Sequence, residues 1–155
     1  MTSPQNHHHG PAEAILESVR RQCQDQDIRL TPIREQVLRL LITEGKPIKA
    51  YDLLERLQEE HARAAPPTVY RALEFLLDNG FVHRLESLNA FVGCGHPEAS
   101  HHSQFLICDR CDGTVELEDH SVVERLRAAA KAQGFRANSQ TIEVHGVCGD
   151  CVEKV

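Results

Sequence analysis

The sequence contains no tryptophan, one methionine, two tyrosines and five phenylalanines among its 155 residues. Hydrophobic residues still make up 41% of the chain, which is enough for a modest aliphatic core. No apolar run approaches the ~18 residues that a bilayer-spanning helix needs. We therefore expect an ordinary globular protein of one domain or two small ones, with no membrane among its partners.

Basic residues are also in short supply. There are 17 Lys and Arg against 23 Asp and Glu, which gives a net charge of −6. Residues 86–155 carry most of this excess, with 6 basic and 11 acidic residues, whereas residues 1–85 hold 11 and 12. Because contact with phosphate is mostly electrostatic, nucleic-acid binding by such a chain requires a local basic face in its first half.

An export signal is a third feature that the sequence lacks. The opening residues, "MTSPQNHHHG", have neither the basic nor the apolar region of a signal peptide. This predicts a cytoplasmic protein with a disordered, histidine-containing tail over residues 1–10. In a reducing compartment, the cysteines are expected to be metal ligands or redox groups more often than disulfides.

Residues 11–80 have the 3.6-residue periodicity of helices, which we expect over residues 11–26, 32–44, 48–60 and 66–79. The second helix has the clearest ends, because Thr31 can cap it, Pro32 suits its first turn and Gly45 follows its last residue. The period then changes to two in "FVHRLES" and "NAFVGC", which predicts a hairpin turning at Leu88–Asn89.

Several helices followed by a small hairpin is the order of a winged helix-turn-helix, whose last helix enters the major groove of DNA. The helical stripes alone fit a four-helix bundle as well. The exposed face of the fourth helix favours DNA binding, since it begins with Thr68, Tyr70 and Arg71. Arg71 can pair with guanine, while Thr68 and Tyr70 can bind phosphate. An ordinary polar helix surface is the alternative for these residues.

The cysteines of the second half form two CxxC pairs, Cys108 with Cys111 and Cys148 with Cys151. Two such pairs supply four thiolates for a tetrahedral zinc ion, and four sulfurs leave no open position for catalysis. A single pair would also suit thioredoxin-like redox chemistry, and any two thiols a disulfide, but two pairs in one small module favour structural zinc.

The segment around these pairs is predicted to fold as a small α+β module. Strands are expected in "SQFLIC", "GTVELE" and "TIEVHGVC", and an amphipathic helix in "SVVERLRAAAKAQGF". About sixty residues bury too little surface for comfortable stability, so a zinc ion joining the start of the module to its end would stabilise it.

A second metal site is suggested by the predicted hairpin. A turn at Leu88–Asn89 sets His83 opposite Cys94, and directly opposed side chains lie about 5 Å apart on one face. His101 and Glu116 can approach from the second module. A Cys–His–His–Glu set suits zinc better than iron or manganese. Alternatively, His83 is a surface residue and Cys94 an inert buried thiol.

Together, "RLTPIREQVLRLL", "AYDLLERL", "PPTVYRALEFLLDNGFVHRLES" and "FLICDRC…VELE…IEVHGVCGDC" resemble the ferric uptake regulator superfamily over residues 12–153. The resemblance is nearest to its zinc-responsive branch, the zinc uptake regulators. It implies a winged-helix DNA-binding domain over 11–94, a hinge over 95–101 and a small α/β dimerisation domain over 102–155 that is stapled by structural zinc.

The resemblance also assigns residues. It implies two zinc ions per subunit, one structural and one regulatory, with DNA contacts at Tyr51 and Arg71. The structural ligands are Cys108, Cys111, Cys148 and Cys151, and the regulatory ligands are His83, Cys94, His101 and Glu116.

The implied function is that of a homodimeric repressor of zinc-uptake genes, which binds an AT-rich palindromic operator when loaded with zinc and is not an enzyme. Relatives can place two dimers on one operator through an acid–arginine pair; Glu55 is present here, but Gln58 stands where the arginine is expected. The alternatives are a sensor of iron, manganese or peroxide, which Cys94 disfavours, and a zinc hydrolase. A hydrolase needs an open coordination position, which a fourth protein ligand would fill.

Overall fold

The structure is a computed structural model that describes residues 12–95, 97 and 103–154. It divides the chain into two compact units, Met1–Ala99 and Ser100–Val155. The predicted tail, residues 1–10, lies outside the described residues, and only residues 95 and 97 of the predicted hinge lie within them. Among the helices that are described, none is long and apolar enough to cross a bilayer.

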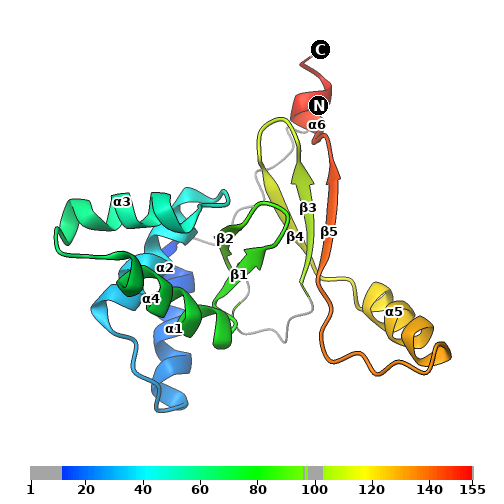
Figure 1. Cartoon of the computed structure of the whole chain (residues 1–155), viewed down its shortest axis with the longest axis horizontal. Coiled ribbons are helices and arrows are strands. Elements are labelled where there is room, and N and C mark those ends of the chain that lie inside the picture. The colour runs from blue at the N-terminus through cyan, green and yellow to red at the C-terminus, as the bar shows by residue number, and fades with distance from the viewer. Residues whose placement is uncertain (1–11, 96, 98–102, 155) are drawn as a thin grey trace. The chain divides into compact units, whose positions relative to one another are not determined.

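The N-terminal unit consists of four helices followed by a β-hairpin (Figure 1). The helices are α1 (Ala12–Asp25), α2 (Pro32–Glu44), α3 (Ala50–Glu60) and α4 (Pro66–Asp78), and the strands are β1 (Val82–Leu85) and β2 (Ala90–Gly93). This is the predicted order of a winged helix-turn-helix. Its core is mainly aliphatic, and Leu16, Leu38, Leu53, Leu57 and Leu76 are fully buried in it, together with Phe81.

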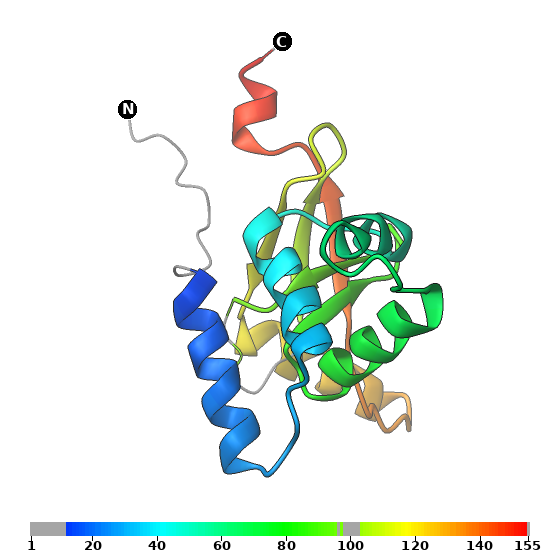
Figure 2. The ribbon, with the colours of Figure 1, turned by 90° about the vertical axis from the view of Figure 1, so that its left-hand side faces the viewer.

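Local signals define α2 as expected. The Thr31 hydroxyl accepts the N–H of Arg34, Pro32 occupies the first turn, and Gly45 ends the helix in the left-handed conformation at φ 65°. Helices α1 and α2 run antiparallel, joined by the loop of residues 26–31 (Figure 2). Arg20 of α1 donates to Glu35 of α2, which fastens the two helices together.

The hairpin is present, but its predicted register is wrong by two residues. Leu85 pairs with Ala90, and His83 therefore lies opposite Val92 rather than Cys94. The loop has four residues, Glu86 to Asn89, because the buried apolar pattern of the strands stops at Leu85 and Ala90. A two-residue bridge between Ile48 and Phe91 ties β2 to the segment that precedes α3.

The C-terminal unit contains a three-stranded sheet in the order β4-β3-β5 (Figure 1). Its elements are β3 (Gln104–Cys108), β4 (Thr114–Leu117), α5 (His120–Ala132), β5 (Ile142–Gly146) and the short α6 (Gly149–Val152). Strand β3 is antiparallel to β4 and parallel to β5. The predicted α+β module is therefore confirmed, whereas α6 was not anticipated.

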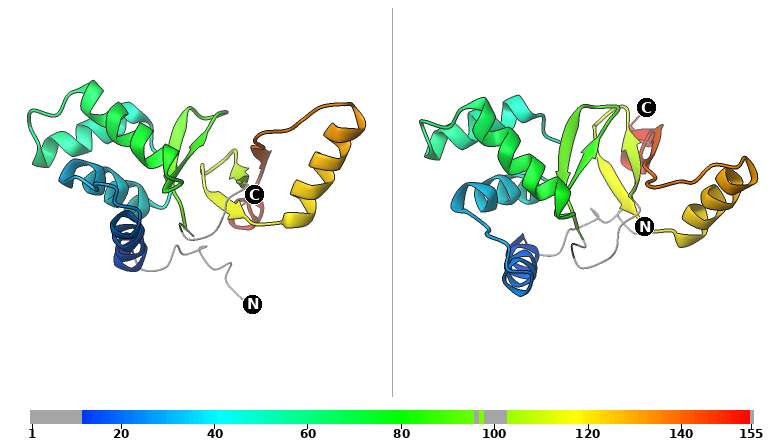
Figure 3. Two further views of the ribbon diagram at one scale, coloured as in Figure 1. Left: turned by 90° about the horizontal axis from the view of Figure 1, so that it is seen from below. Right: turned by 60° about the horizontal axis from the view of Figure 1, so that its bottom comes forward.

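Helix α5 lies beyond one end of the sheet rather than across its face (Figure 3). All thirteen of its residues are described, and Val123 is the buried one. Leu126, three residues after Val123 on the apolar face of α5, is 44% exposed. The apolar face of α5 is thus covered only in part by its own unit.

Candidate metal centre and nucleic-acid interface

The two CxxC pairs meet at one end of the C-terminal sheet. Cys108 ends β3, Cys111 lies in the turn that leads to β4, Cys148 precedes α6 and Cys151 lies within it. The four sulfur atoms all lie within 4.8 Å of one another. This is the cluster that the spacing of the cysteines predicted.

The distances within the cluster suit a tetrahedral ion. Cys111 Sγ and Cys148 Sγ are 3.8 Å apart. Two sulfurs bonded to one zinc ion at ~2.3 Å are separated by about 3.8 Å when the geometry is tetrahedral. Four sulfur donors of this kind are the set that structural zinc prefers, so the residues present fit the ion.

Backbone N–H groups favour thiolates in this cluster. The N–H of Cys148 donates to Cys108 Sγ at 3.3 Å, and that of Gly113 donates to Cys111 Sγ at 3.4 Å. The first of these bonds is the main reason that the pKa of Cys108 falls to about 6. Hydrogen bonding with Cys148 and burial together raise the pKa of Cys151 to about 12. A cation is needed to keep all four sulfurs ionised together.

Further hydrogen bonds hold the ends of the module against each other. Arg110 Nη1 donates to the carbonyl oxygen of Cys151 at 2.8 Å, which joins the first CxxC turn to α6. His145 Nδ1 lies 3.1 Å from Asp109 Oδ1, so His145 is a hydrogen-bonded residue and not a ligand of this cluster.

In the N-terminal unit, His83 and Cys94 lie on the same face of the hairpin although they are not directly opposed. His83 pairs with Val92, and Cys94 lies two residues after Val92 in the sequence. The N–H of Cys94 donates to the carbonyl oxygen of Phe81, which continues the hairpin contact beyond β2. A ring nitrogen of His83 and the sulfur of Cys94 lie within 4.8 Å of each other, and Cys94 is fully buried. The two side chains can therefore reach one ion.

The other two residues of the predicted regulatory set, His101 and Glu116, follow the hairpin in the sequence. Glu116 is a half-buried residue of β4 and pairs with Phe105 of β3. His101 lies outside the described residues, as do His96 and His102.

The predicted DNA contacts cluster at the start of α3 and in the first half of α4. Tyr51 is 69% exposed and Tyr70 58% exposed, and Arg71, which follows Tyr70 in the sequence, is exposed as well. Thr68 differs, because its hydroxyl accepts the N–H of Ala65 and so helps to begin α4. Exposed aromatic and basic side chains at a helix start suit DNA contact.

A hollow of about 640 Å³, which we call the wing hollow, lies between these helices and the hairpin. Its lining comprises Lys49, Ala50, Tyr51, Tyr70, Leu73, Glu74, Leu77, Asp78, Arg84, Asn89 and Phe91. Lys49 and Arg84 were not singled out from the sequence. For Arg84, its place as a basic residue within the first hairpin strand could have indicated a contact with DNA.

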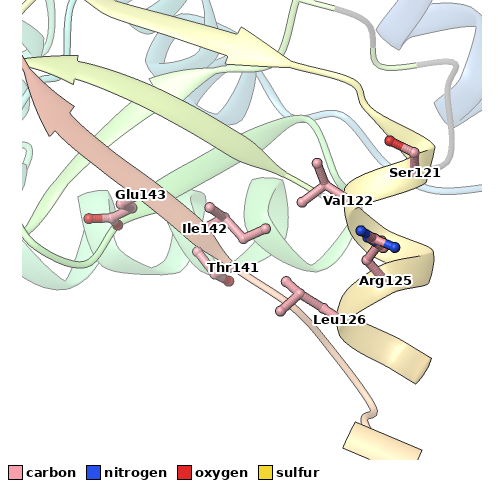
Figure 4. A pocket seen from close by; sticks show the side chains of 7 residues that line it. All are labelled: Ser121, Val122, Arg125, Leu126, Thr141, Ile142 and Glu143. Carbon is pink, nitrogen blue, oxygen red and sulfur yellow. The ribbon is translucent and has the colours of Figure 1, made fainter. Parts of the chain in front are cut away.

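The C-terminal unit exposes apolar side chains from several elements. A hollow of about 650 Å³ between α5 and β5 is lined in part by Val122, Leu126 and Ile142, which point toward one another (Figure 4). Leu126 is itself exposed, and the other large apolar side chains exposed in the described part of this unit are Leu106, Leu117, Phe135, Val144, Val147 and Val152. This amount of exposed apolar surface on a small unit is typical of an association surface.

Comparison with known proteins places the chain in a family. The profile of the Ferric uptake regulator family matches residues 25–145. The zinc uptake regulation protein of Escherichia coli strain K12 is 42% identical over 142 residues, which cover 91% of this chain and 83% of that protein.

Two solved structures agree with this assignment. A zinc uptake regulator complexed with zinc and DNA superposes with a TM-score of 0.90 at 41% identity, covering 94% of this chain and 97% of the other. The crystal structure of holo XcZur has a TM-score of 0.84 at 56% identity and covers 90% and 98%. The family profile covers more than half of the chain and the relatives match most of it, and the chain belongs to the ferric uptake regulator family.

Proposed function

We propose that this protein is a zinc-responsive, DNA-binding transcriptional regulator that represses zinc-uptake genes in the cytoplasm. The observation that carries the proposal is its likeness, along nearly the whole chain, to a zinc uptake regulator solved with zinc and DNA. The cluster of four cysteines and the exposed start of α4 supply the corresponding chemistry within this chain.

The structural zinc would be held by Cys108, Cys111, Cys148 and Cys151. Zinc supplies a cross-link among four thiolates and, with its shell filled by sulfur, no catalysis. The backbone N–H groups of Cys148 and Gly113 already favour charge on two of these sulfurs. The cross-link would join the end of β3 to α6, and thus stabilise a unit whose buried core is small.

A second, regulatory zinc would be held by His83 and Cys94 together with His101 and Glu116. One sulfur, two nitrogens and one carboxylate form a set that suits zinc better than manganese or ferrous iron. The closeness of His83 to Cys94 within the hairpin supports the first two ligands. His101 and Glu116 enter the proposal through the family resemblance and their ligand chemistry.

The partner of the N-terminal unit would be double-stranded DNA. Arg71, exposed near the start of α4, can donate two hydrogen bonds to a guanine in the major groove. Tyr51 and Tyr70, with Thr68 beside them, would bind phosphates or base edges nearby. An AT-rich palindromic operator would present one such half-site to each subunit.

Two copies of the chain would associate through their C-terminal units. The exposed Leu126 and Val144, and the apolar hollow between α5 and β5, supply a surface that a second copy can cover. Strand β5 lies at an edge of the described sheet and can pair with another strand. A pair of dimers on one operator lacks the arginine partner for Glu55, since Gln58 instead donates to the carbonyl oxygen of Ala64.

Regulation would follow from linkage between the two ligands. A dimer reads two half-sites about 34 Å apart only if its two α4 helices are held at that spacing. When His83 and Cys94 share an ion with residues of the other unit, the two units lose freedom of movement. DNA binding then costs less conformational entropy, and each ligand raises the affinity for the other.

Two other functions fit less well. Sensors of iron, manganese or peroxide share the fold, but the cysteine in the hairpin site favours zinc. A zinc hydrolase requires three protein ligands and an open position for water. The four sulfurs of the CxxC cluster leave none, and the proposed regulatory set also has four protein ligands.

The test is a titration of operator binding against free zinc, with ferrous iron and manganese as controls. We expect zinc alone to raise the affinity for the operator when the metals are compared at matched free concentrations. Equal responses to iron or manganese would favour a sensor of one of those metals. No response to any metal would refute the proposal.

A further inference from the structure

Arg84 of β1 is held in place by side chains at the tip of the hairpin. Its Nη2 donates to Asn89 Oδ1 at 3.0 Å, and its Nε lies 3.7 Å from a carboxylate oxygen of Glu86. Among the described residues, Nη1 has no such partner. A guanidinium carries five N–H donors, so most of its hydrogen-bonding capacity is available to a ligand.

Asn89 is well suited to holding this arginine. Its φ of 47° lies in the left-handed region, where asparagine is one of the few residues with a side chain that occurs readily. The turn is closed by the N–H of Asn89, which donates to the carbonyl oxygen of Glu86 at 3.3 Å. The backbone of the loop therefore fixes the oxygen that orients Arg84.

Arg84 lines the wing hollow together with Tyr51 and Tyr70. Lys49, which precedes α3, adds a second positive charge to the lining, and Glu74 and Asp78 in the second half of α4 add two negative charges. The cation from the hairpin thus shares one hollow with the two exposed tyrosines near the base-reading end of α4.

We propose that Arg84 is a further DNA-contact residue, which binds a backbone phosphate of the operator and is positioned by Asn89. This proposal rests on the proposed function. Half to two-thirds of the hydrogen bonds between proteins and DNA go to phosphate and sugar, and the planar fork of arginine matches two phosphate oxygens. Lying beside Tyr51 and Tyr70, Arg84 would meet the strand whose bases α4 reads.

Phosphate is the favoured target because of how the side chain is held. Two partners keep Arg84 against the hairpin, which shortens its reach toward base edges deep in a groove. The acidic Glu74, Asp78 and Glu86 repel further phosphates and so limit the contact to one phosphate per subunit. The contact would place the hairpin on the duplex and carry no base preference of its own.

The test measures operator affinity of the zinc-loaded full-length dimer over a range of salt concentrations. The variants are Arg84→Ala, Arg84→Lys and Asn89→Gly, with Arg127→Ala as a control that removes an exposed charge from α5. Glycine at position 89 preserves the left-handed turn and removes the side chain whose oxygen orients Arg84. Zinc content and dimer mass establish that each variant is folded.

For Arg84→Ala we expect affinity to fall about tenfold or more, as for loss of a charge-assisted hydrogen bond. The slope of log affinity against log salt should decrease by about 0.9 per phosphate, or about 1.8 for a dimer. Arg84→Lys should retain the slope with weaker binding. Asn89→Gly should weaken operator binding in the wild-type background but cause no further loss of affinity in the Arg84→Ala background. This non-additivity distinguishes a residue that positions Arg84 from one whose loss damages the fold.

Other outcomes would overturn the proposal. An unchanged slope and affinity for Arg84→Ala would remove Arg84 from the interface. A loss confined to the operator, with no loss on random duplex, would make it a base-reading residue instead of a phosphate contact. Failure of the unaltered protein to bind the operator with zinc would refute the proposed function itself, and the same titration detects it before any variant is compared.

Discussion

Cys111 Sγ and Cys148 Sγ lie 3.8 Å apart although 37 positions separate the two residues in the chain. Between them the chain forms β4, α5 and β5, so this contact closes nearly the whole C-terminal unit into one loop. A unit of this size with so much exposed apolar surface needs such a closure to be stable.

Removing one sulfur from this cluster should therefore unfold the unit. For Cys108→Ser we expect the loss of one tightly held zinc ion per subunit and the loss of the dimer, since ligand deletion removes folding energy along with the metal. Metal analysis and size-exclusion mass check this. A folded dimer with unchanged zinc content would show that Cys108 is not a ligand, and His120→Ala, which changes an exposed residue of the same unit, serves as the control.

The local features of the fold were predictable because each is determined by neighbouring residues. Thr31, Pro32 and Gly45 mark the ends of α2 by their own conformational preferences. The CxxC spacing likewise indicates a metal site without knowledge of the fold. In contrast, α6 has four residues, too few for any periodicity to be recognised.

The prediction that His83 and Cys94 share a face of the hairpin is correct although the predicted register is wrong. Its loop is centred on Ser87–Leu88, one residue earlier than the expected Leu88–Asn89, so the pairing moved by two residues. A shift of two keeps every side chain on its original face, and His83 and Cys94 therefore still share a face. Periodicity within the hairpin contains no information about His101 or Glu116, because neither residue belongs to the hairpin.

Arg71→Ala tests base reading by α4. If Arg71 makes a bidentate contact with guanine, operator affinity should fall by about 1–3 kcal/mol, and preference at one base pair of each half-site should relax. Gel-shift titrations against single-base operator variants measure both effects. An equal loss on random DNA would instead identify Arg71 as a phosphate contact.

The ion pair between α1 and α2 predicts a pH-dependent contribution to stability. Arg20, which donates to Glu35, holds the pKa of that carboxyl below its usual value of 4.5. The contribution is therefore complete above the unfolded-state pKa and is lost as the pH falls through the lower, folded-state value. Both side chains are partly exposed, so we expect Glu35→Gln to lower the free energy of unfolding by less than about 1 kcal/mol at pH 7.

Thermal unfolding at several pH values measures this difference, which should shrink toward zero as the pH falls below the carboxyl pKa. Glu17→Gln is the matched control, because Glu17 contacts the same arginine from within α1 and is more exposed. A difference between wild type and Glu35→Gln that stayed constant down to acidic pH would rule out the ion pair as its source.

Cys94→Ser separates sensing from folding. Cys94 lies in the N-terminal unit and the four-cysteine cluster in the C-terminal unit, and each unit has its own buried residues. The variant should keep its helices, its dimer mass and its structural zinc, yet lose the zinc-dependent gain in operator binding. What remains should equal the weak, salt-sensitive binding of the zinc-free protein, because phosphate contacts survive.

Cys23→Ser is the matched control for this variant, since Cys23 is the other buried thiol among the described residues of the same unit. Both changes bury a hydroxyl in an apolar environment, so any shared loss of stability is measured and subtracted. Cys23→Ser should still respond to zinc, with two zinc ions per subunit, whereas Cys94→Ser should retain only the one that resists strong chelators. A wild-type response from Cys94→Ser would mean that the sensing site is built from other ligands.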